Sequence, residues 1–488
     1  MIKNIRWPSF LLLCFLSFIF LAFFSVSTSF LYDYPKSIDS HVYQVIGKLW
    51  NEGYLPYVDV WDHKGPVIYF INAIGYALTG NKYGVFIIQL FFFSATLVIL
   101  WDIFRTSMSS KKSWTCIFVY LVALAFCMGD NCVEEYVMPF LILSFYLQYQ
   151  WITIVSDKGV IAHPPLWATL YGFVFAFSLL TRLTNALGVC AGVGLILVSL
   201  LIKGLWRNFL NNILFFVLGF FFLFFPFAFY FYIHDAFDEM WFGTFLYNLD
   251  YVGNVDNIVT LQQKIYSRIS LVACYFLLTI AIFRFYKRSY FVGVYFFVIC
   301  ISLMSWLYNS NGYLHYTMLS MPFLVLALLD IEKIKKCFDN IINLERFSVF
   351  FKTLIVLISI AFVFRDLYKG YHFNCEKQSI ELYGKLIKRI PPQERNSFLA
   401  YDMRPSVYLY YDVKPGVPFF CNHNFYSYNS RNLYFKMKEA LKKQEVKWMI
   451  VKKPYTGVFK DELDVLYTEE AEIQMDNKSK TVLMKLKQ

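Results

Sequence analysis

The sequence has little charge. Only 16% of its 488 residues are Asp, Glu, Lys or Arg, whereas 58% are hydrophobic and 21% are aromatic. With its positive mean hydropathy, this composition excludes an ordinary soluble globular protein, in which about a quarter of the residues are charged. Apolar runs of the length that crosses a bilayer, roughly 17 to 25 residues, recur from about residue 8 to about residue 365. The sequence therefore predicts a polytopic membrane protein.

The sequence also lacks several short motifs of enzymes and metal sites. It contains no CxxC or HExxH spacing, which would indicate structural zinc or a zinc protease, and no Gly-rich phosphate loop or internal repeat. Seven of its ten cysteines lie in or beside predicted helices or on the cytoplasmic side, and we interpret them as small apolar residues or free thiols. We expect Cys132, Cys375 and Cys421 outside, where Cys375 and Cys421 could pair in an oxidising compartment.

The apolar runs predict about eleven membrane-spanning helices. Their ranges are 8–30, 83–104, 114–129, 136–154, 166–181, 184–202, 213–233, 267–283, 290–308, 317–330 and 348–364. The first run could be mistaken for a signal peptide, but it is longer than the usual apolar region of about 7 to 15 residues, so we expect an uncleaved anchor.

The distribution of basic residues predicts the orientation. The short connections on one side carry Lys and Arg, from Lys3 and Arg6 to Arg346, and this side is expected to be cytoplasmic. The connections on the other side are acidic. The formal charge of +11 is therefore mainly a topology signal together with a basic C-terminal segment, and it does not indicate a nucleic-acid partner. In a cell (inner) membrane, the odd number of crossings places the N-terminus in the cytoplasm and the C-terminal segment outside.

The chain divides into two predicted domains. Residues 1–365 form the membrane domain, whose first outward loop, residues 31–82, is long and polar. In this loop Val42 to Leu49 has helical spacing, and the apolar run Val67 to Leu78, about 12 residues long, is too short to span a bilayer. We expect both to be interfacial helices that contact membrane lipids.

Residues 366–488 have a mixed composition and predict a small extracytoplasmic α/β domain. Helical spacing covers 380–390 and 431–442. Strand-like runs cover 397–401, 407–411, 446–451 and 481–486.

The order of features in the first loop is distinctive. Asp39, a short helix, a G-x-x-P-Y-x-D element from Gly53 to Asp59, and Lys64-x-Pro66 follow one another, and a second outward loop is acidic. This order resembles the GT-C superfamily of integral-membrane glycosyltransferases, specifically the protein mannosyltransferase and aminoarabinose transferase-like branch. The resemblance implies a GT-C fold of about eleven transmembrane helices with an external C-terminal domain. It also implies a polyprenyl-phosphate sugar donor and action on the outer side of the membrane.

Asp39 matches the family's catalytic acidic residue in the first loop, where a carboxylate accepts the proton of the attacking hydroxyl. The family usually has Asp-Glu here, whereas this chain has Asp39-Ser40, which removes a second acidic contact or metal ligand. The alternative is a solvated loop carboxylate that caps the following helix.

Lys64 matches the lysine of the family's Lys-Pro-Pro element, here Lys-Gly-Pro. Because the donor's leaving group is a phosphate, an ammonium that stabilises its growing negative charge would assist departure. The alternative is a snorkelling interfacial lysine without a role in the reaction. Asp59, Asp62 and His63 of the same loop are additional candidates for the site.

Asp130, Glu134 and Glu135 crowd the second outward loop. The family often has an Asn-x-x-Glu element here, which Asn131 to Glu134 matches. The resemblance implies that such a carboxylate binds sugar hydroxyls, the acceptor or a divalent cation, the one cofactor that the sequence suggests. The alternatives are helix capping by Asp130 and ordinary solvation of one glutamate.

Two further elements match the family. Arg182 lies between two apolar segments, where relatives often carry a basic residue near the lipid phosphate, and an ion pair with Glu134 or Glu135 is the alternative. His315-Tyr316 resembles a His-Tyr pair that many relatives have at the outer end of a late helix, and a hydrogen-bonding interfacial histidine is the alternative.

The sequence therefore predicts a membrane glycosyltransferase that moves a sugar from a polyprenyl-phosphate donor to a lipid, glycan or protein acceptor. One alternative is a lipid-linked oligosaccharide flippase or another transporter, but transporters typically carry charges within their helices and have repeated halves. Another is a polysaccharide polymerase or ligase with an oligosaccharide diphosphate donor, which would not need the arrangement of Asp39 and Lys64.

Overall fold

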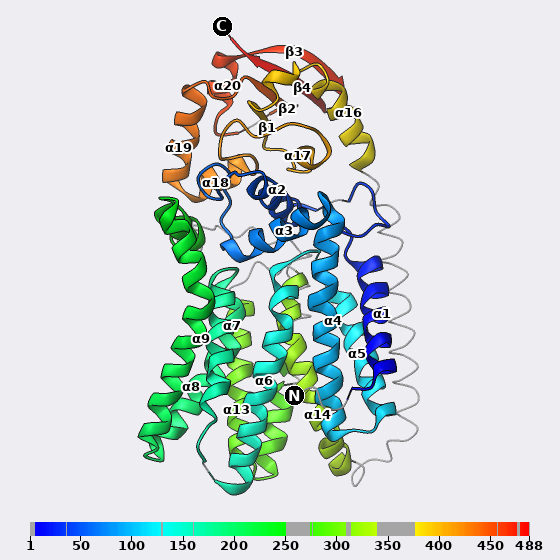
Figure 1. Ribbon diagram of the computed structural model, residues 1–488, viewed down its shortest axis with the longest axis vertical. Helices are drawn as coiled ribbons and strands as arrows, with labels where there is room; N and C mark the ends of the chain where they lie inside the picture. Colours follow the sequence, from blue (N-terminus) through cyan, green and yellow to red (C-terminus); the bar gives the residue numbers. More distant parts are fainter. Residues whose placement is uncertain are drawn as a thin grey trace. The chain divides into compact units, whose positions relative to one another are not determined.

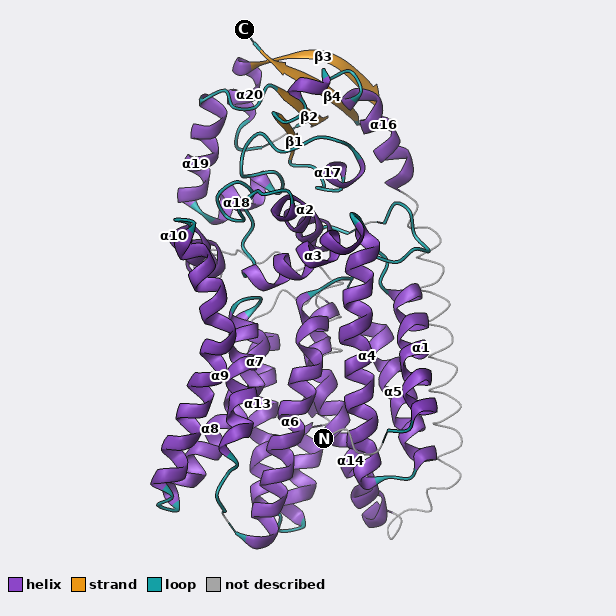
Figure 2. Cartoon of the chain, in the orientation of Figure 1, coloured by secondary structure: helices purple, strands orange, loops and turns teal. Residues whose placement is uncertain are grey.

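The computed structural model, drawn in Figures 1 and 2, describes residues 5–35, 37–127, 130–159, 161–249, 274–275, 277–308, 314–338, 376–455, 457–475 and 479–487. These residues are mostly helical, with a four-stranded sheet towards the C-terminus. The chain separates into two compact units. Unit 1 comprises Met1–Ser25, Gln89–Phe227 and Asn257–Tyr368, and unit 2 comprises Val26–Ile88, Ala228–Asp256 and Lys369–Gln488.

Unit 1 is a helical bundle. Its helices are α1 (Trp7–Phe24), most of α4 (Lys82–Ser107), α5 (Ser110–Cys127), α6 (Val133–Lys158), α7 (Pro165–Leu179), α8 (Leu187–Ile202), most of α9 (Trp206–Ile233), α13 (Tyr290–Tyr308) and α14 (Met321–Phe338). The short turns η1 (Leu183–Ala186) and η3 (Leu314–Ser320) lead into α8 and α14. Helix α6 packs against α7, α8, α13 and α14, which run alongside it in Figure 1. The core of unit 1 therefore lies around α6, where Tyr136 and Trp151 are buried.

Six of the described helices are long and apolar enough to cross a membrane: Trp7–Phe24, Lys82–Ser107, Ser110–Cys127, Val133–Lys158, Leu183–Ile202 and Trp206–Ile233. Shorter apolar helices are Pro66–Thr79, Pro165–Leu179, Leu277–Tyr286, Tyr290–Met304 and His315–Asp330. The chain is thus a polytopic α-helical membrane protein. The predicted crossing at 348–364 and part of 267–283 lie outside the described residues, so the number of about eleven crossings stays a prediction.

Helix α9 shows how the bundle combines lipid-facing surface with close packing. Its side chains are apolar along most of its length, and Phe222 is exposed, as expected of a helix that faces lipid. Where α9 meets α7, a Cβ on Gly172 would lie 1.8 Å from the carbonyl oxygen of Phe216, and one on Gly219 would lie 1.9 Å from that of Thr169. The two glycines therefore allow the backbones to approach closely.

Unit 2 contains both short helices predicted in the first loop, α2 (Asp39–Asn51) and α3 (Pro66–Thr79). A proline begins α3, where its missing N–H costs no hydrogen bond, and Gly80 ends it with a φ of 72°. The two helices pack closely, because position 47 of α2 is a glycine on which a Cβ would lie 2.6 Å from Asn72 Cβ. The same unit contains the short elements α10 (Phe237–Trp241) and η2 (Phe242–Leu246).

The C-terminal part of unit 2 is an α/β arrangement around a sheet of strand order β1-β2-β4-β3 (Figure 2). Strands β1 and β2 are parallel, and β4 is antiparallel to both of its neighbours. The strands are β1 (Phe398–Tyr401), β2 (Trp448–Lys453), β3 (Tyr467–Gln474) and β4 (Lys480–Leu486). The helices are α16 (Lys377–Ile387), α17 (Val407–Tyr410), α18 (His423–Asn429), α19 (Arg431–Lys442) and α20 (Lys460–Leu466). The predicted helices at 380–390 and 431–442, and the predicted strands at 397–401, 446–451 and 481–486, are confirmed within a few residues.

The strand predicted at 407–411 is wrong, because these residues form α17. Val407 and Tyr408 are neighbours in sequence and both are buried, whereas a half-buried strand alternates. The Tyr408 hydroxyl accepts a hydrogen bond from Ala400 N at 2.9 Å. A short apolar run does not distinguish a strand from a buried helical turn by its periodicity.

The predicted disulfide stays a prediction. Cys421 is a buried free thiol among the described cysteines, and its proposed partner Cys375 lies outside the described residues.

Candidate functional site

The centre of the first loop is a buried carboxylate. Asp62 is 3% exposed. Its Oδ1 accepts a hydrogen bond from the Tyr426 hydroxyl at 2.5 Å, and its Oδ2 accepts one from the Tyr69 hydroxyl at 2.6 Å. Tyr69 belongs to α3 and Tyr426 to α18, so two elements distant in the sequence hold the same side chain within unit 2.

His63 and Lys64 continue from this carboxylate. His63 Nδ1 lies 3.2 Å from Asp62 Oδ1, and Lys64 Nζ lies 2.6 Å from His63 Nε2. The main chain is fixed as well, because Asn248 donates to the His63 carbonyl at 2.8 Å and the Tyr57 hydroxyl donates to the Lys64 carbonyl at 2.7 Å. Three consecutive residues therefore form an Asp-His-Lys chain that ends in an ammonium group.

The charges of this Asp-His-Lys chain depend on each other. Burial alone would raise the pKa of Asp62, but its interaction with His63, the charge of Lys64 and the hydrogen bond from Tyr426 outweigh it, so the pKa of Asp62 lies well below its usual range. Burial and the charge of Lys64 lower the pKa of His63, while Asp62 and Asp39 oppose this fall. Because an ammonium group can only donate, Nε2 of His63 accepts from Lys64, and the proton of a neutral imidazole then lies on Nδ1, 3.2 Å from Asp62 Oδ1.

Asp39 is the exposed first residue of α2. The residue at the N-cap position of α2 is Ile38, and no side chain caps this end of the helix, so the alternative of a capping role does not describe the structure. Because its charge acts on the pKa of His63, the Asp39 carboxylate belongs to the same electrostatic environment as the Asp-His-Lys chain. The carboxylate is exposed and caps no helix, so it can accept the proton of a hydroxyl group.

Ser40 faces the interior of unit 2. Its Oγ lies 2.5 Å from Ser27 Oγ and accepts a hydrogen bond from Gln44 Nε2 at 3.0 Å. The Tyr76 hydroxyl extends this polar row by donating to Gln44 Oε1 at 3.3 Å. The position at which the family usually has a glutamate is therefore an interior hydrogen-bonding position in this chain.

In unit 1, Glu134 and Arg182 form an ion pair. Arg182 Nη1 lies 3.1 Å from Glu134 Oε1, and the guanidinium carbon lies 3.6 Å from the centre of the Tyr316 ring. The ring of His315 packs edge-on against that of Tyr316, with centroids 4.5 Å apart. Three of the sequence-predicted elements are thus brought together, with Arg182 between the glutamate and the tyrosine.

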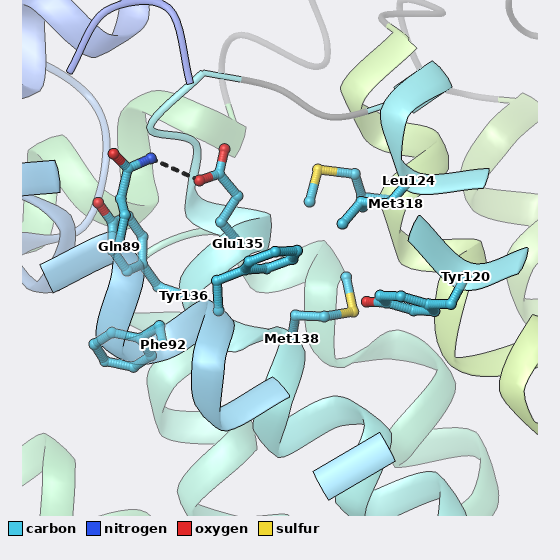
Figure 3. Close-up of a pocket in the computed structure, with 9 residues that line it drawn as sticks. Gln89, Phe92, Tyr120, Leu124, Glu135, Tyr136, Met138 and Met318 are labelled. Carbon is cyan, nitrogen blue, oxygen red and sulfur yellow. Dashed lines mark hydrogen bonds between the residues drawn. The ribbon is translucent and has the colours of Figure 1, made fainter. Parts of the chain in front are cut away.

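Glu135 has a different set of partners. Its Oε1 accepts a hydrogen bond from Cys132 N at 3.3 Å, which caps α6, and its Oε2 accepts one from Gln89 Nε2 at 2.7 Å. Gln89 in turn accepts from the Ser25 hydroxyl at 3.0 Å. Figure 3 shows Glu135 and Gln89 in the wall of a mostly apolar pocket that Tyr120, Met138 and Met318 also line.

Asp59 and Asp130 are the remaining acidic candidates. Asp59 is exposed, and its Oδ2 accepts a hydrogen bond from Leu55 N at 2.6 Å, which closes a turn. Asp130 lies in the bend before α6. No cluster of three His, Cys, Asp or Glu side chains that could hold a metal ion occurs among the described residues.

The sequence-predicted residues thus form two groups. Unit 2 holds Asp39, Asp59, Asp62, His63 and Lys64, and unit 1 holds Asp130, Glu134, Glu135, Arg182, His315 and Tyr316. Sequence reasoning missed Tyr69, Tyr426 and Gln89. Tyr69 lies seven residues after Asp62, which is a weak local signal, whereas Tyr426 is 364 positions away and carries none.

Two solved structures are similar to this chain, to different degrees. The structure of ArnT from Cupriavidus metallidurans bound to undecaprenyl phosphate matches over 98% of each chain with a TM-score of 0.56 and 10% identity. The Archaeoglobus fulgidus oligosaccharyltransferase, in a complex with Zn and sulfate, matches over 90% of this chain and 67% of its own with a TM-score of 0.44 and 12% identity. A search of the curated proteins finds no match.

The likeness to ArnT over almost the whole of both chains shows that this chain has the GT-C fold. A family model described as "Putative competence-induced protein Ccs4 N-terminal domain" matches residues 2–370. Because this match covers most of the chain, the protein belongs to the Ccs4 N-terminal domain family.

Proposed function

We propose that the protein is a membrane glycosyltransferase that moves a sugar from a polyprenyl-phosphate donor to an acceptor hydroxyl on the outer side of the cell membrane. The observation that carries this proposal is the Asp-His-Lys chain, which holds an ammonium group in the first loop of a GT-C fold. The ArnT structure with the same fold contains undecaprenyl phosphate, which supports a lipid phosphate as the partner.

In the proposed reaction Asp39 acts as the general base. Its exposed carboxylate accepts the proton of the acceptor hydroxyl as the oxygen attacks the anomeric carbon of the sugar. The bond between the sugar and the phosphate oxygen breaks, and its electron pair stays with the phosphate. Lys64 stabilises the negative charge that develops there.

The two acids of unit 1 have supporting roles in this proposal. Glu134 is paired with Arg182, and Glu135 caps α6 and accepts from Gln89. Neither carboxylate is therefore needed as a base. Their contacts fix the first turn of α6 to the residue before the turn η1 and to α4 within unit 1.

The decisive experiment uses purified protein in liposomes with three radiolabelled lipids. These are a polyprenyl-monophosphate hexose, a polyprenyl-monophosphate pentose and a polyprenyl-diphosphate oligosaccharide, each offered with extracted envelope lipids and glycans as acceptors. We expect label transfer from a monophosphate sugar and none from the diphosphate. Transfer from the diphosphate alone would indicate a polymerase or ligase, and movement of lipid across the bilayer without transfer would indicate a flippase.

A further inference from the structure

The proposed reaction changes the charge of the donor phosphate. Before transfer the phosphate is a diester with one negative charge. After the sugar leaves, the prenyl phosphate is a monoester whose second ionisation has a pKa near 6, so it carries almost two negative charges at neutral pH. Lys64 supplies a single positive charge. A site that binds both the diester and the monoester well would need a second positive charge only when the monoester is bound.

His63 occupies the position for such a cation. Its Nε2 lies 2.6 Å from Lys64 Nζ, so the lone pair of this nitrogen accepts a hydrogen bond from the ammonium group. When the ammonium turns towards a phosphate, Nε2 becomes available to a proton. The Nδ1 side of the ring stays directed at Asp62 Oδ1, 3.2 Å away, and a fixed carboxylate favours the imidazolium form of a histidine.

The surroundings of His63 favour a change of charge over a permanent charge. Burial and the nearby ammonium of Lys64 hold the pKa of His63 below its usual value. Movement of the ammonium away from Nε2 weakens one of these causes, and a phosphate dianion adds an attraction of the opposite sign. Among the described residues, Asp62, Lys64 and Asp39 act on the charge of the ring, and Tyr247 and Tyr426 pack against it.

We propose that His63 takes up one proton at Nε2 when the monoester product occupies the site, and that the imidazolium and Lys64 together bind the phosphate dianion. This inference rests on the proposed function. The proton comes from the buffered solvent: the bond between this proton and the solvent or buffer donor breaks as the N–H bond at Nε2 forms, and no carbon or phosphorus bond changes. The proton of the acceptor hydroxyl goes separately to Asp39.

Tyr69 and Tyr426 direct the proton to His63 and not to Asp62. Both hydroxyls donate to Asp62, at 2.6 and 2.5 Å, and keep it ionised and in place. Because the carboxylate cannot turn away, the charge of an imidazolium is balanced on the Nδ1 side while Nε2 faces the phosphate. The two tyrosines are positioning residues in this scheme.

The experiment measures proton uptake on binding. The full-length protein in detergent is titrated calorimetrically with a short-chain prenyl phosphate, at about pH 7.5 and in buffers of different ionisation enthalpy, because the dependence on the buffer gives the number of protons exchanged. The methyl ester of the same prenyl phosphate is the matched ligand, since it has the same chain and one negative charge. His63→Gln is the matched variant, because glutamine keeps a hydrogen-bond acceptor for Lys64 but cannot be protonated.

We expect the wild-type protein to take up close to one proton with the monoester and none with the methyl ester. The wild-type affinity for the monoester should fall by up to about tenfold per pH unit above neutral pH, and that of H63Q should stay level. Binding of the monoester without proton uptake, or equal uptake by H63Q, would overturn the inference and leave the proposed function standing. If the wild-type protein binds neither ligand, both fail. If H63Q binds neither ligand, the inference is decided by the wild-type protein alone: proton uptake with the monoester and none with the methyl ester supports it, and equal uptake with both overturns it.

Discussion

Arg182 lies 3.1 Å from Glu134, and the glutamate is almost fully buried, with its side chain 1% exposed. The other side of the guanidinium packs on the ring of Tyr316. Family resemblance pointed to Arg182 as a contact for the lipid phosphate, and an ion pair with one of the second-loop acids was the alternative. The ion pair is the arrangement that the structure has, and it gives Arg182 a role that does not depend on a ligand.

Replacement of Arg182 by methionine should therefore destabilise the protein strongly. The buried Glu134 would lose its counter-charge, and breaking one partner of a buried pair typically costs about 3–5 kcal/mol. The double variant R182M/E134L removes both charges and should recover most of the stability. Thermal and chemical unfolding of the protein in detergent would measure these differences.

Arg207→Met is the control for this series, because Arg207 is an exposed arginine at the start of α9. It should change the free energy of unfolding by less than about 0.5 kcal/mol. The double variant should also keep its transfer activity within about tenfold of wild type. A stable double variant without activity would show instead that Arg182 or Glu134 contacts the substrate.

Asp39→Asn should abolish transfer and leave the fold intact. The carboxylate is exposed and caps no helix, so the amide should not alter the melting temperature. Loss of a general base typically lowers the rate by about 10²- to 10⁴-fold. The measurement is the initial rate with a saturating polyprenyl-monophosphate sugar, compared with the melting curve of the same preparation.

Asp59→Asn is the matched control, since Asp59 is another exposed carboxylate of the same loop and its hydrogen bond from Leu55 N can be kept by an amide oxygen. This variant should retain nearly full activity. Near-normal rates for Asp39→Asn, or an equal loss in both variants, would remove Asp39 from the role of base.

Much of the fold could be predicted from local pattern. The spacing of Val42, Val45, Ile46 and Leu49 placed α2, and a proline followed by an apolar run too short to span placed α3. Both predictions succeeded because an amphipathic period and helix end signals are local properties of the sequence. The prediction of a strand at 407–411 was wrong because the burial of these residues depends on contacts with β1, which the local sequence period does not report.

The site could be predicted only in part. Lys64 and Asp39 were found through resemblance, and His63 and Asp62 were named only as additional members of the loop. Their arrangement depends on Tyr426, which reaches Asp62 from 364 residues away. A hydrogen bond between residues so distant in the sequence leaves no trace in composition or spacing, so the Asp-His-Lys chain became visible only in three dimensions.

Ser40→Glu tests why this chain departs from the Asp-Glu pair of the glycosyltransferases that its first loop resembles. The serine hydroxyl is buried between Ser27 and Gln44, so a glutamate would place a carboxylate without a counter-charge in the interior. We expect a clear loss of stability, about 3 kcal/mol or more, and no gain in activity. The melting temperature and the transfer rate of purified protein provide the test.

Ser40→Ala is its control. It removes one hydroxyl without adding charge and should cost about 1–2 kcal/mol through the hydrogen bonds lost. A glutamate variant as stable as wild type and more active would mean that position 40 can turn towards the substrate, contrary to the buried orientation seen here.

His41 makes the stability of the protein sensitive to mild acid. The side chain is 1% exposed, and burial together with the charges of Arg404 and Lys82 lowers the pKa of His41 to about 3. In the unfolded chain a histidine has a pKa near 6.5. The stabilisation from keeping His41 neutral is therefore complete above about pH 6.5 and is lost as the pH falls towards 3, because the unfolded state gains a proton that the folded state does not.

Between pH 7 and pH 5 this difference amounts to about 2 kcal/mol of unfolding free energy. His41→Gln should remove that part of the pH dependence. His234→Gln, which alters an exposed histidine directly after α9, should keep the wild-type dependence. Chemical denaturation at a series of pH values measures both. If His41→Gln loses as much stability as wild type between pH 7 and pH 5, the acid sensitivity arises from other groups, and the buried imidazole of His41 must be able to take up its proton without unfolding.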